Sequence, residues 1–325
     1  MNGSWWVIFA SSVSVYLGIA VGSAVRWLGW LSEEADQSLM RLVVRVLYPC
    51  LIFSVVSRSP ALRNPHNLLL PPLVGYGTVA LGIVVAWIVA RASRRVNGLA
   101  DASQRRTFTA CVGIYNYGFI PIPLVALLFD DRTLGVLFVH NIGADLAVWT
   151  LGVILFSGTL GRRWWLSTIN APSITILIAL AANFARVGEH LPQFLDTVVQ
   201  WMGQSSIPLS LVLIGAIVAD EIQSRGGGMS RADRGKLIGW SVLLRLGLLP
   251  PAFLALAWFL PGSVELKRVM VVQAAMPAAT FSIVMCRHYG GDPPVALRVA
   301  LSTSLFSLLT IPLWITLGMQ LLGLH

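Results

Sequence analysis

The stretch CVGIYNYGFIPIPLVALLF, residues 111–129, decides the fold of this chain. It is apolar and long enough to lie in a membrane, because a helical span needs about 20 such residues. It also carries Pro121 and Pro123 close to the polar pair Asn116 and Tyr117. Each proline lacks a backbone donor and clashes with the preceding turn, so the helix should break near the bilayer centre. Irregular backbone survives at that depth only where protein or a wet cavity surrounds it, which predicts a site at the break.

The remainder of the chain is also apolar. Hydrophobic residues make up 56% and charged residues 11% of the 325 positions, and the mean hydropathy is +0.76. A water-soluble domain of this composition would aggregate, so we predict an all-α polytopic membrane protein whose solvent is the lipid bilayer. From hydropathy we expect ten transmembrane helices, at Trp5–Val25, Ser38–Ser57, Leu68–Ala90, Phe108–Phe129, Leu134–Phe156, Pro172–Arg186, Phe194–Ala219, Leu237–Leu260, Val269–Cys286 and Pro294–Leu322.

The charges of the chain follow a topological pattern. Lys and Arg together number 23, against 14 for Asp and Glu. The basic residues lie in the breaks between apolar runs, so we expect no nucleic-acid partner. The breaks with Arg105, Arg106, Arg231 and Arg234 belong to the richer of the two alternating sets. The positive-inside rule places that set in the cytoplasm and leaves both termini on the non-cytoplasmic side. The preference for Arg over Lys, 21 against 2, favours a bacterial genome, so we expect a bacterial inner (plasma) membrane.

Short similarities recur between the two halves of the chain. YPCLIFSVV at 48–56 resembles IPLSLVLIG at 207–215, and other pairs share the offset of about 160 residues. The pattern predicts two five-helix repeats, at 1–160 and 161–325. Because five is odd, the second copy would enter the membrane from the opposite side, which gives an inverted repeat typical of transporters. Chance similarity among apolar helices is the alternative interpretation.

A second proline-broken helix is expected in the ninth span. QAAMPAATFS, residues 273–282, has Pro277 among small residues that permit close backbone approach. Helices four and nine would cross at the bilayer centre and direct their half-helix N-termini at a carboxylate. The alternative is that these prolines only kink helices for packing. The substrate-binding candidates are Asn116, Tyr117, Gly118, Gln273 and Ala278, and the crossover candidates are Pro121, Pro123 and Pro277.

An acidic residue lies in the middle of the fifth span. Asp145 follows His140 and Asn141 in HNIGAD. A mid-span acid is a functional candidate through proton coupling, cation binding or an ion pair. We therefore name Asp145, His140, Asn141 and Arg245 as candidates for ion coupling. The alternatives are a structural ion pair between Asp145 and Arg245, and a packing role for His140.

Other motifs carry no chemistry. GYGTVA, 75–80, loosely resembles a nucleotide-binding turn but lies in a span with no strand before it. The residues GIAVG, 18–22, form a small-residue face suited to close helix contact, either within the bundle or at a dimer seam. Cys50, Cys111 and Cys286 lack metal-ligand spacing. With no catalytic constellation at usable spacing, we expect no enzyme, no catalytic residue, no cofactor and no bound metal.

Three segments resemble a known family. NYGFIPIPL at 116–124, MPAAT at 276–280 and LSTSLFSLLTIPL at 301–313 look like the auxin efflux carrier family, whose bacterial branch includes malonate and malate permeases. The resemblance implies an elevator-like carrier, with spans 1, 2, 6 and 7 as a scaffold that forms a homodimer and spans 3–5 and 8–10 as the transport domain. It also implies that Asn116 contacts the substrate. The short connection at 157–168 departs from the long loop of the plant carriers.

The sequence therefore favours a secondary active transporter of small organic anions, with carboxylates as the expected class, driven by membrane potential or by a coupled proton or sodium ion. A membrane receptor or sensor that keeps the carrier fold is the second hypothesis. The short loops of this chain argue against a receptor or sensor, because a sensor needs an output surface. A channel is the third, and an inverted repeat around one midplane site is less typical of channels.

Overall fold

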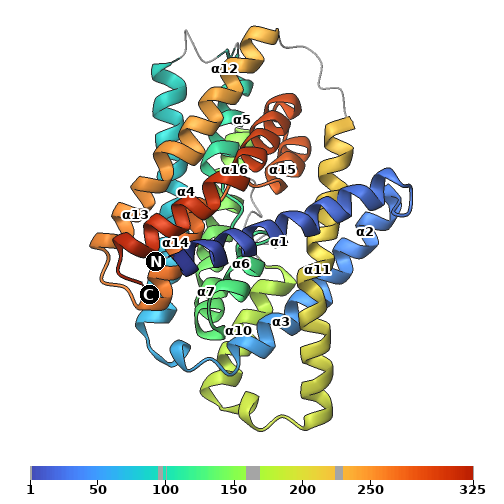
Figure 1. Ribbon diagram of the computed structural model, residues 1–325, viewed down its shortest axis with the longest axis vertical. Helices are drawn as coiled ribbons and strands as arrows, with labels where there is room; N and C mark the ends of the chain where they lie inside the picture. The colour runs from blue at the N-terminus through green and yellow to red at the C-terminus, as the bar shows by residue number, and fades with distance from the viewer. Residues whose placement is uncertain (1, 94–97, 100, 159–168, 224–229, 325) are drawn as a thin grey trace.

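The computed structural model describes residues 2–93, 98–99, 101–158, 169–223 and 230–324. Within these ranges the regular structure is helical, apart from one isolated β-bridge (Figure 1). The predicted repeat boundary between residues 160 and 161, and most of the connection at 157–168, lie outside the described residues. The prediction of an all-α protein is confirmed for the part of the chain that is described.

Seven described helical segments are long and apolar enough to cross a membrane, which confirms a multi-pass membrane protein. Three predicted spans have no such segment within the described ranges. One is the shorter apolar helix α10, and the other two are interrupted helices. The seven segments are Trp5–Trp27, Glu34–Val56, His66–Ala92, Asp131–Ser157, Gln193–Asp220, Arg231–Phe259 and Pro293–Leu321.

Several of these segments are continuous helices made of successive α and π turns. The helices of the first half are α1 (Asn2–Trp27), α2 (Glu33–Leu42) continued by η1 (Val43–Leu47) and α3 (Tyr48–Val56), the 3-10 turn η2 (Pro60–Arg63), α4 (His66–Ala92), α5 (Ala102–Gly113), α6 (Pro121–Leu128), and α7 (Asp131–Ala147) continued by η3 (Val148–Gly152) and α8 (Val153–Ser157). Those of the second half are α10 (Ala171–Phe184), the 3-10 turn η4 (Val187–Glu189), α11 (Gln193–Gln223), α12 (Arg231–Val242) continued by η5 (Leu243–Leu248) and α13 (Leu249–Phe259), α14 (Val264–Ala275), α15 (Phe281–Tyr289) and α16 (Pro293–Leu321).

Prolines explain two of the π turns. η1 and η5 end just before Pro49 and Pro250, which have no N–H to continue the regular hydrogen-bond ladder. In the second case the freed carbonyl of Leu246 accepts a hydrogen bond from Nε1 of Trp314 at 2.7 Å. The widened turn is thus satisfied by a side chain of α16, as buried backbone groups in lipid require.

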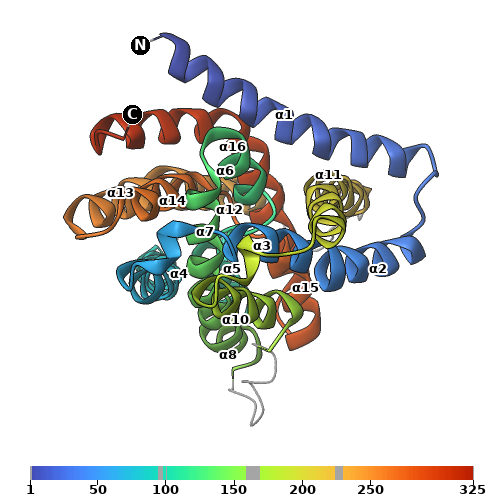
Figure 2. The same ribbon diagram turned by 90° about the horizontal axis from the view of Figure 1, so that it is seen from below.

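The helices pack in two groups. In the first, α11 packs along α1 and α3, and α10 packs on α3. In the second, α4 packs on α5 and α7, and α16 packs on α5, α12 and α14. Figure 2 shows α2 and α11 at one side of the molecule and α4 and α13 at the other. The two groups touch where α3 and α10 meet α7, and where α1 meets α6 and α16.

Glycines let α1 and α11 approach closely. A Cβ added at Gly22 would lie 2.1 Å from the carbonyl oxygen of Val212, and one added at Gly215 would lie 1.9 Å from that of Ile19. No side chain larger than hydrogen fits at either position. Of the two roles predicted for the small-residue face 18–22, the structure shows the one within the bundle.

The two proline-rich segments interrupt their helices at the predicted places. α5 ends at Gly113 and α6 begins at Pro121, while α14 ends at Ala275 and α15 begins at Phe281. The extended residues between these half-helices pair with each other in an antiparallel bridge of Tyr115 with Ala278. Its hydrogen bonds run from Asn116 N to Pro277 O at 2.8 Å and from Ala279 N to Ile114 O at 3.0 Å. Each break therefore satisfies part of the other's backbone, deep in the core.

Candidate functional site

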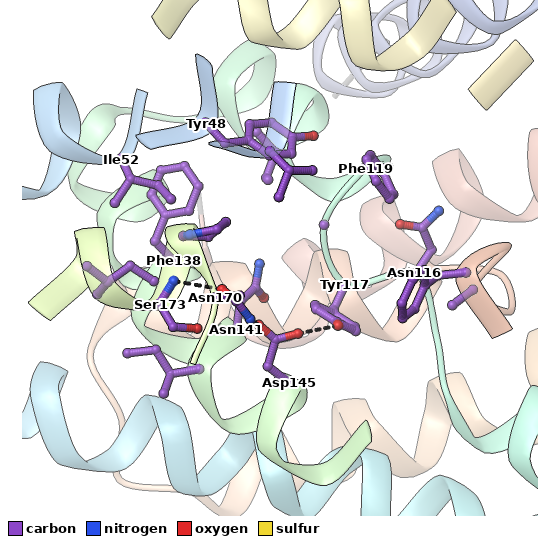
Figure 3. A pocket seen from close by; sticks show the side chains of 18 of the residues that line it. Tyr48, Ile52, Asn116, Tyr117, Phe119, Phe138, Asn141, Asp145, Asn170 and Ser173 are labelled. Carbon is purple, nitrogen blue, oxygen red and sulfur yellow. Dashed lines mark hydrogen bonds between the residues drawn. The ribbon is translucent and has the colours of Figure 1, made fainter. Parts of the chain in front are cut away.

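A cavity of about 270 Å³ lies between the crossover and the first group of helices (Figure 3). One wall comes from the first break, α7 and the start of α15, and the other comes from η1, α3 and α10. Aromatic and aliphatic side chains cover most of the surface. The polar side chains among the described residues that line it are Tyr48, Asn116, Tyr117, Asn141, Asp145, Asn170, Ser173 and Thr280.

Asp145 is the centre of a hydrogen-bonded cluster in this cavity. The hydroxyl of Tyr117 donates to Oδ1 of Asp145, as Figure 3 shows. Nδ2 of Asn170 donates to Oδ2 at 3.5 Å. Asn170 is itself fixed, because its Oδ1 caps α10 by accepting from the amide of Ser173 at 2.9 Å. The cluster thus joins the crossover, α7 and the start of α10.

A second set of polar side chains contacts the first break and stabilises it. Nε2 of Gln273 donates to the carbonyl oxygen of Tyr117 at 3.1 Å and to Oδ1 of Asn141 at 3.3 Å. Nδ1 of His140 lies 3.3 Å from the same Asn141 oxygen. Gln273 and His140 are buried and do not line the cavity, whereas Asn141 does. Gln273 and His140 therefore position the crossover and Asn141 without facing the open space.

The remaining crossover candidates differ in position. Asn116 and Gly118 line the cavity, and Oδ1 of Asn116 accepts from the amide of Ile120 at 3.4 Å. Ala278 is fully buried, and its amide donates to Oγ1 of Thr303 at 3.2 Å. Pro121, Pro123 and Pro277 are not among the lining residues, so they shape the backbone rather than the surface of the cavity.

Arg245 lies on the other side of the crossover and is fully buried. Its Nε donates to the carbonyl oxygen of Met276 at 2.8 Å, and its Nη2 lies 3.5 Å from that of Gln273. The guanidinium carbon is 5.0 Å from the ring centroid of Tyr115 and 5.3 Å from that of Phe253. No ion pair joins it to Asp145 in the described part of the chain, so the alternative of a structural Asp145–Arg245 pair is wrong.

Sequence reasoning missed the wall that the first group of helices supplies. Tyr48, Asn170 and Ser173 come from α3 and the start of α10, and Thr280 begins the half-helix after the second break. The capping pattern of Asn170 before Ala-Pro-Ser was visible in the sequence. Nothing in it showed that this helix start faces Asp145.

A second cavity, of about 680 Å³, lies farther along α3 between α11, α6 and the start of α7. It is lined by the charged residues Arg58, Asp130, Asp131 and Arg132 and by Gln200 and Gln204. Burial opposes ionisation of Asp130, but hydrogen bonds from the hydroxyl and amide of Thr133 outweigh it and lower the pKa of this carboxyl. The lining of this cavity is more polar than that of the cavity at the crossover, from which it is separate.

Comparison with known proteins places the chain in a family. The sequence profile of a family described as membrane transport protein matches residues 7–163 and 156–315. The chain belongs to this family. It is the family of the auxin efflux carriers, so the resemblance predicted from the motifs at 116–124, 276–280 and 301–313 is confirmed. The protein is accordingly a membrane transporter and not an enzyme.

Two relatives in this family are archaeal. An uncharacterized transporter of Methanothermobacter thermautotrophicus is 27% identical over 315 residues, which cover 95% of this chain and 99% of the relative. An uncharacterized transporter of Methanocaldococcus jannaschii is 20% identical over 313 residues, which cover 92% and 95% respectively. The similarity extends over nearly the full length of all three chains.

Proposed function

We propose that this family member is a secondary active transporter of small organic anions, with carboxylates as the substrate class, that binds the anion at the crossover. The main support for this proposal is the set of backbone amides without hydrogen-bond partners at and just before the start of the half-helix that follows each break. Gly118 and Phe119 lie in the first break just before α6, and Thr280 and Phe281 begin α15; all four residues line the cavity, and their amides make no hydrogen bond within the described residues. Free N–H groups at half-helix N-termini favour an anion through both hydrogen bonding and the helix dipole.

The walls of the cavity also limit the kind of anion. Apart from the polar groups, the lining includes the rings of Phe119, Phe138, Trp149 and Phe281. Such walls suit an apolar or aromatic body, while the few polar groups fix orientation. A compact carboxylate with an apolar portion therefore fits this site better than a highly charged one.

The packing of the helices suggests how the anion would cross. α1, α2–α3, α10 and α11 correspond to the proposed scaffold, and the other helices correspond to the proposed transport domain. The cavity lies along the seam between the two groups. We propose elevator-like alternating access, in which the crossover and its anion move against the scaffold, with ten spans arranged as two inverted repeats.

We further propose that the protein lies in a bacterial inner membrane with both termini on the non-cytoplasmic side. The scaffold helices would form a homodimer, and transport of the anion would be coupled to an ion.

Uptake into proteoliposomes tests the substrate class. Purified protein would be given a panel of labelled mono- and dicarboxylates, with imposed pH, sodium or potential gradients. At least one carboxylate should accumulate above the level in protein-free vesicles.

The substitution Asn116→Ala should raise the KM for that carboxylate about tenfold, the change expected from a loss of roughly 1.4 kcal/mol of binding free energy. Asn64→Ala, on an exposed turn, is the matched control and should transport normally. No carboxylate uptake, or normal uptake by Asn116→Ala, would contradict the proposal or its site.

A further inference from the structure

The cavity at the crossover contains one acidic side chain and no basic one among the described residues that line it. Asp145 is that acid, and its neighbours in the wall are neutral amides, hydroxyls and hydrophobic rings. An anion bound here would share a largely apolar space with a carboxylate. Two negative charges in one such site disfavour each other strongly, and the usual result is that one of the groups takes up a proton.

We infer that Asp145 binds one proton together with the anionic substrate, so that the protein carries a proton and an anion in the same step. This inference rests on the proposed function and names its coupled ion. The proton on Asp145 removes the charge that would repel the substrate. It also turns one carboxyl oxygen into a donor.

The contacts of Asp145 favour a proton over a metal ion. Both of its oxygens accept hydrogen bonds from neutral donors, Tyr117 and Asn170. A hard cation instead needs several oxygen ligands around it. No group of three or more Asp, Glu, His or Cys side chains able to hold a metal occurs in the described ranges. A proton needs no such shell, and the Tyr117 hydroxyl can either donate to Asp145 or accept from it.

The hydrogen bond between Asn170 and Asp145 joins the two groups of helices, so protonation of Asp145 can affect their relative movement. Asp145 belongs to α7, whereas Asn170 starts α10, in the group of helices that forms the proposed scaffold. Protonation replaces a charge-assisted hydrogen bond between them by a weaker neutral one. Uptake of the proton and the anion therefore loosens a contact across the seam along which the transport domain would move.

Other titratable groups near Asp145 are accounted for. Tyr117 and Tyr48 face the same cavity, from the crossover and from α3. His140, one turn earlier on α7, contacts Asn141, and α10 has no charged residue. The charged residues of α14 and α15 lie at the ends of those helices away from the breaks. Arg41 of α2 and Arg45 of η1 are exposed and are not among the lining residues. On α4, which packs on α7, the titratable groups are Tyr76 within the helix and His66 and Arg91 at its ends.

The test uses the carboxylate from the panel that the wild type takes up best. Vesicles would contain a pH-sensitive dye, and potassium with valinomycin would hold the potential at zero. Wild-type protein should acidify the interior when the carboxylate is added outside. Its KM should fall with falling pH, by up to about tenfold per pH unit above the titration range of Asp145. An outward-directed or absent proton flux during carboxylate uptake would overturn the inference.

Asp145→Asn separates this inference from the proposed function. The amide imitates the protonated acid, so counterflow exchange should persist with a KM that no longer varies with pH, and no proton should move. Asp145→Glu should restore the pH dependence, and Asp131→Asn, at an exposed acid of the second cavity, should retain it. An unchanged pH profile and proton flux in Asp145→Asn would refute the coupling role and leave carboxylate transport standing. Failure of the wild type to move any carboxylate would refute the proposed function instead.

Discussion

At the scale of single residues, Arg245 shows how a broken helix is stabilised in a membrane protein. Breaking α14 leaves carbonyl groups at its C-terminal end without partners in the helix. The guanidinium supplies donors to the carbonyls of Met276 and Gln273, and its positive charge matches the negative end of the helix dipole. Its faces rest on the rings of Tyr115 and Phe253. The residue thus stabilises the crossover that the proposed site depends on.

Replacing Arg245 should therefore cost stability. Arg245→Met keeps the volume but removes the donors to two buried carbonyls, so we expect a loss of about 2 to 3 kcal/mol, the range for hydrogen bonds that involve a charged group. Arg245→Lys should recover only part of it, because a lysine cannot donate in the same planar geometry. The measurement is the apparent melting temperature in detergent. Arg91→Met, at the exposed end of α4, is the control. Equal melting temperatures for the Arg245 and Arg91 variants would show that the buried contacts are not needed.

The hydroxyl of Tyr117 offers a second test at the same scale. It stabilises the charged form of Asp145 by donating to it. Tyr117→Phe should therefore let Asp145 take up its proton at higher pH, which shifts the whole pH profile of carboxylate affinity upward. The profile of KM against pH in proteoliposomes measures this. An unchanged or lowered profile would mean that the hydroxyl does not stabilise the charged carboxylate.

At the scale of elements, glycine determines how closely the helices pack. α1 and α11 approach so closely that a Cβ at Gly22 would overlap the backbone of Val212. In contrast, a Cβ at Gly77 of α4 would meet no atom within 4 Å. The two glycines look alike in the sequence, since both lie in apolar helices, but only one is required by a helix contact.

The substitutions Gly22→Ala and Gly77→Ala should differ in their effect on stability. The first forces α1 away from α11 and should lower the apparent melting temperature. The second adds a good helix former in open space and should be neutral or stabilising, by up to about 1 kcal/mol. Thermal unfolding of the two variants, measured side by side, gives the comparison. Equal shifts would mean that the helix contact does not determine stability.

These elements also show what the sequence can and cannot predict. The two helix breaks were predictable, because a proline acts on its own backbone and on the turn before it. The facing wall was not, because Tyr48 and Asn170 reach the cavity only through the packing of distant helices. The sequence also could not predict that Gln273 and His140 are buried next to the cavity without lining it, for a related reason. A helix that is buried on several sides has no single polar face, so hydropathy does not give its rotation.

At the scale of the whole molecule, the proposed mechanism requires the two groups of helices to slide along their seam. Tyr48 of α3 and Phe119 of the crossover meet across that seam, with ring centroids 6.2 Å apart. Trp149 of η3 and Phe281 of α15 make a similar contact, at 6.0 Å, but within the proposed transport domain. The two pairs therefore offer matched sites for cross-linking, one between the groups and one inside a group.

Cysteine pairs at these sites should behave differently once they are joined by a short thiol-reactive linker. With Cys50, Cys111 and Cys286 replaced by alanine, a link between positions 48 and 119 should fix the seam and reduce uptake by about tenfold or more, because alternating access needs the domain movement. A link between positions 149 and 281 does not cross the seam, so it should leave the maximal rate of uptake near that of the unlinked variant, with any effect confined to KM because both side chains line the cavity. A reducible linker allows each variant to serve as its own control, since reduction should restore transport only where the link had stopped it. If the 48–119 link left transport unchanged, the two groups would not move relative to each other at this contact, and an elevator movement along the seam would be excluded.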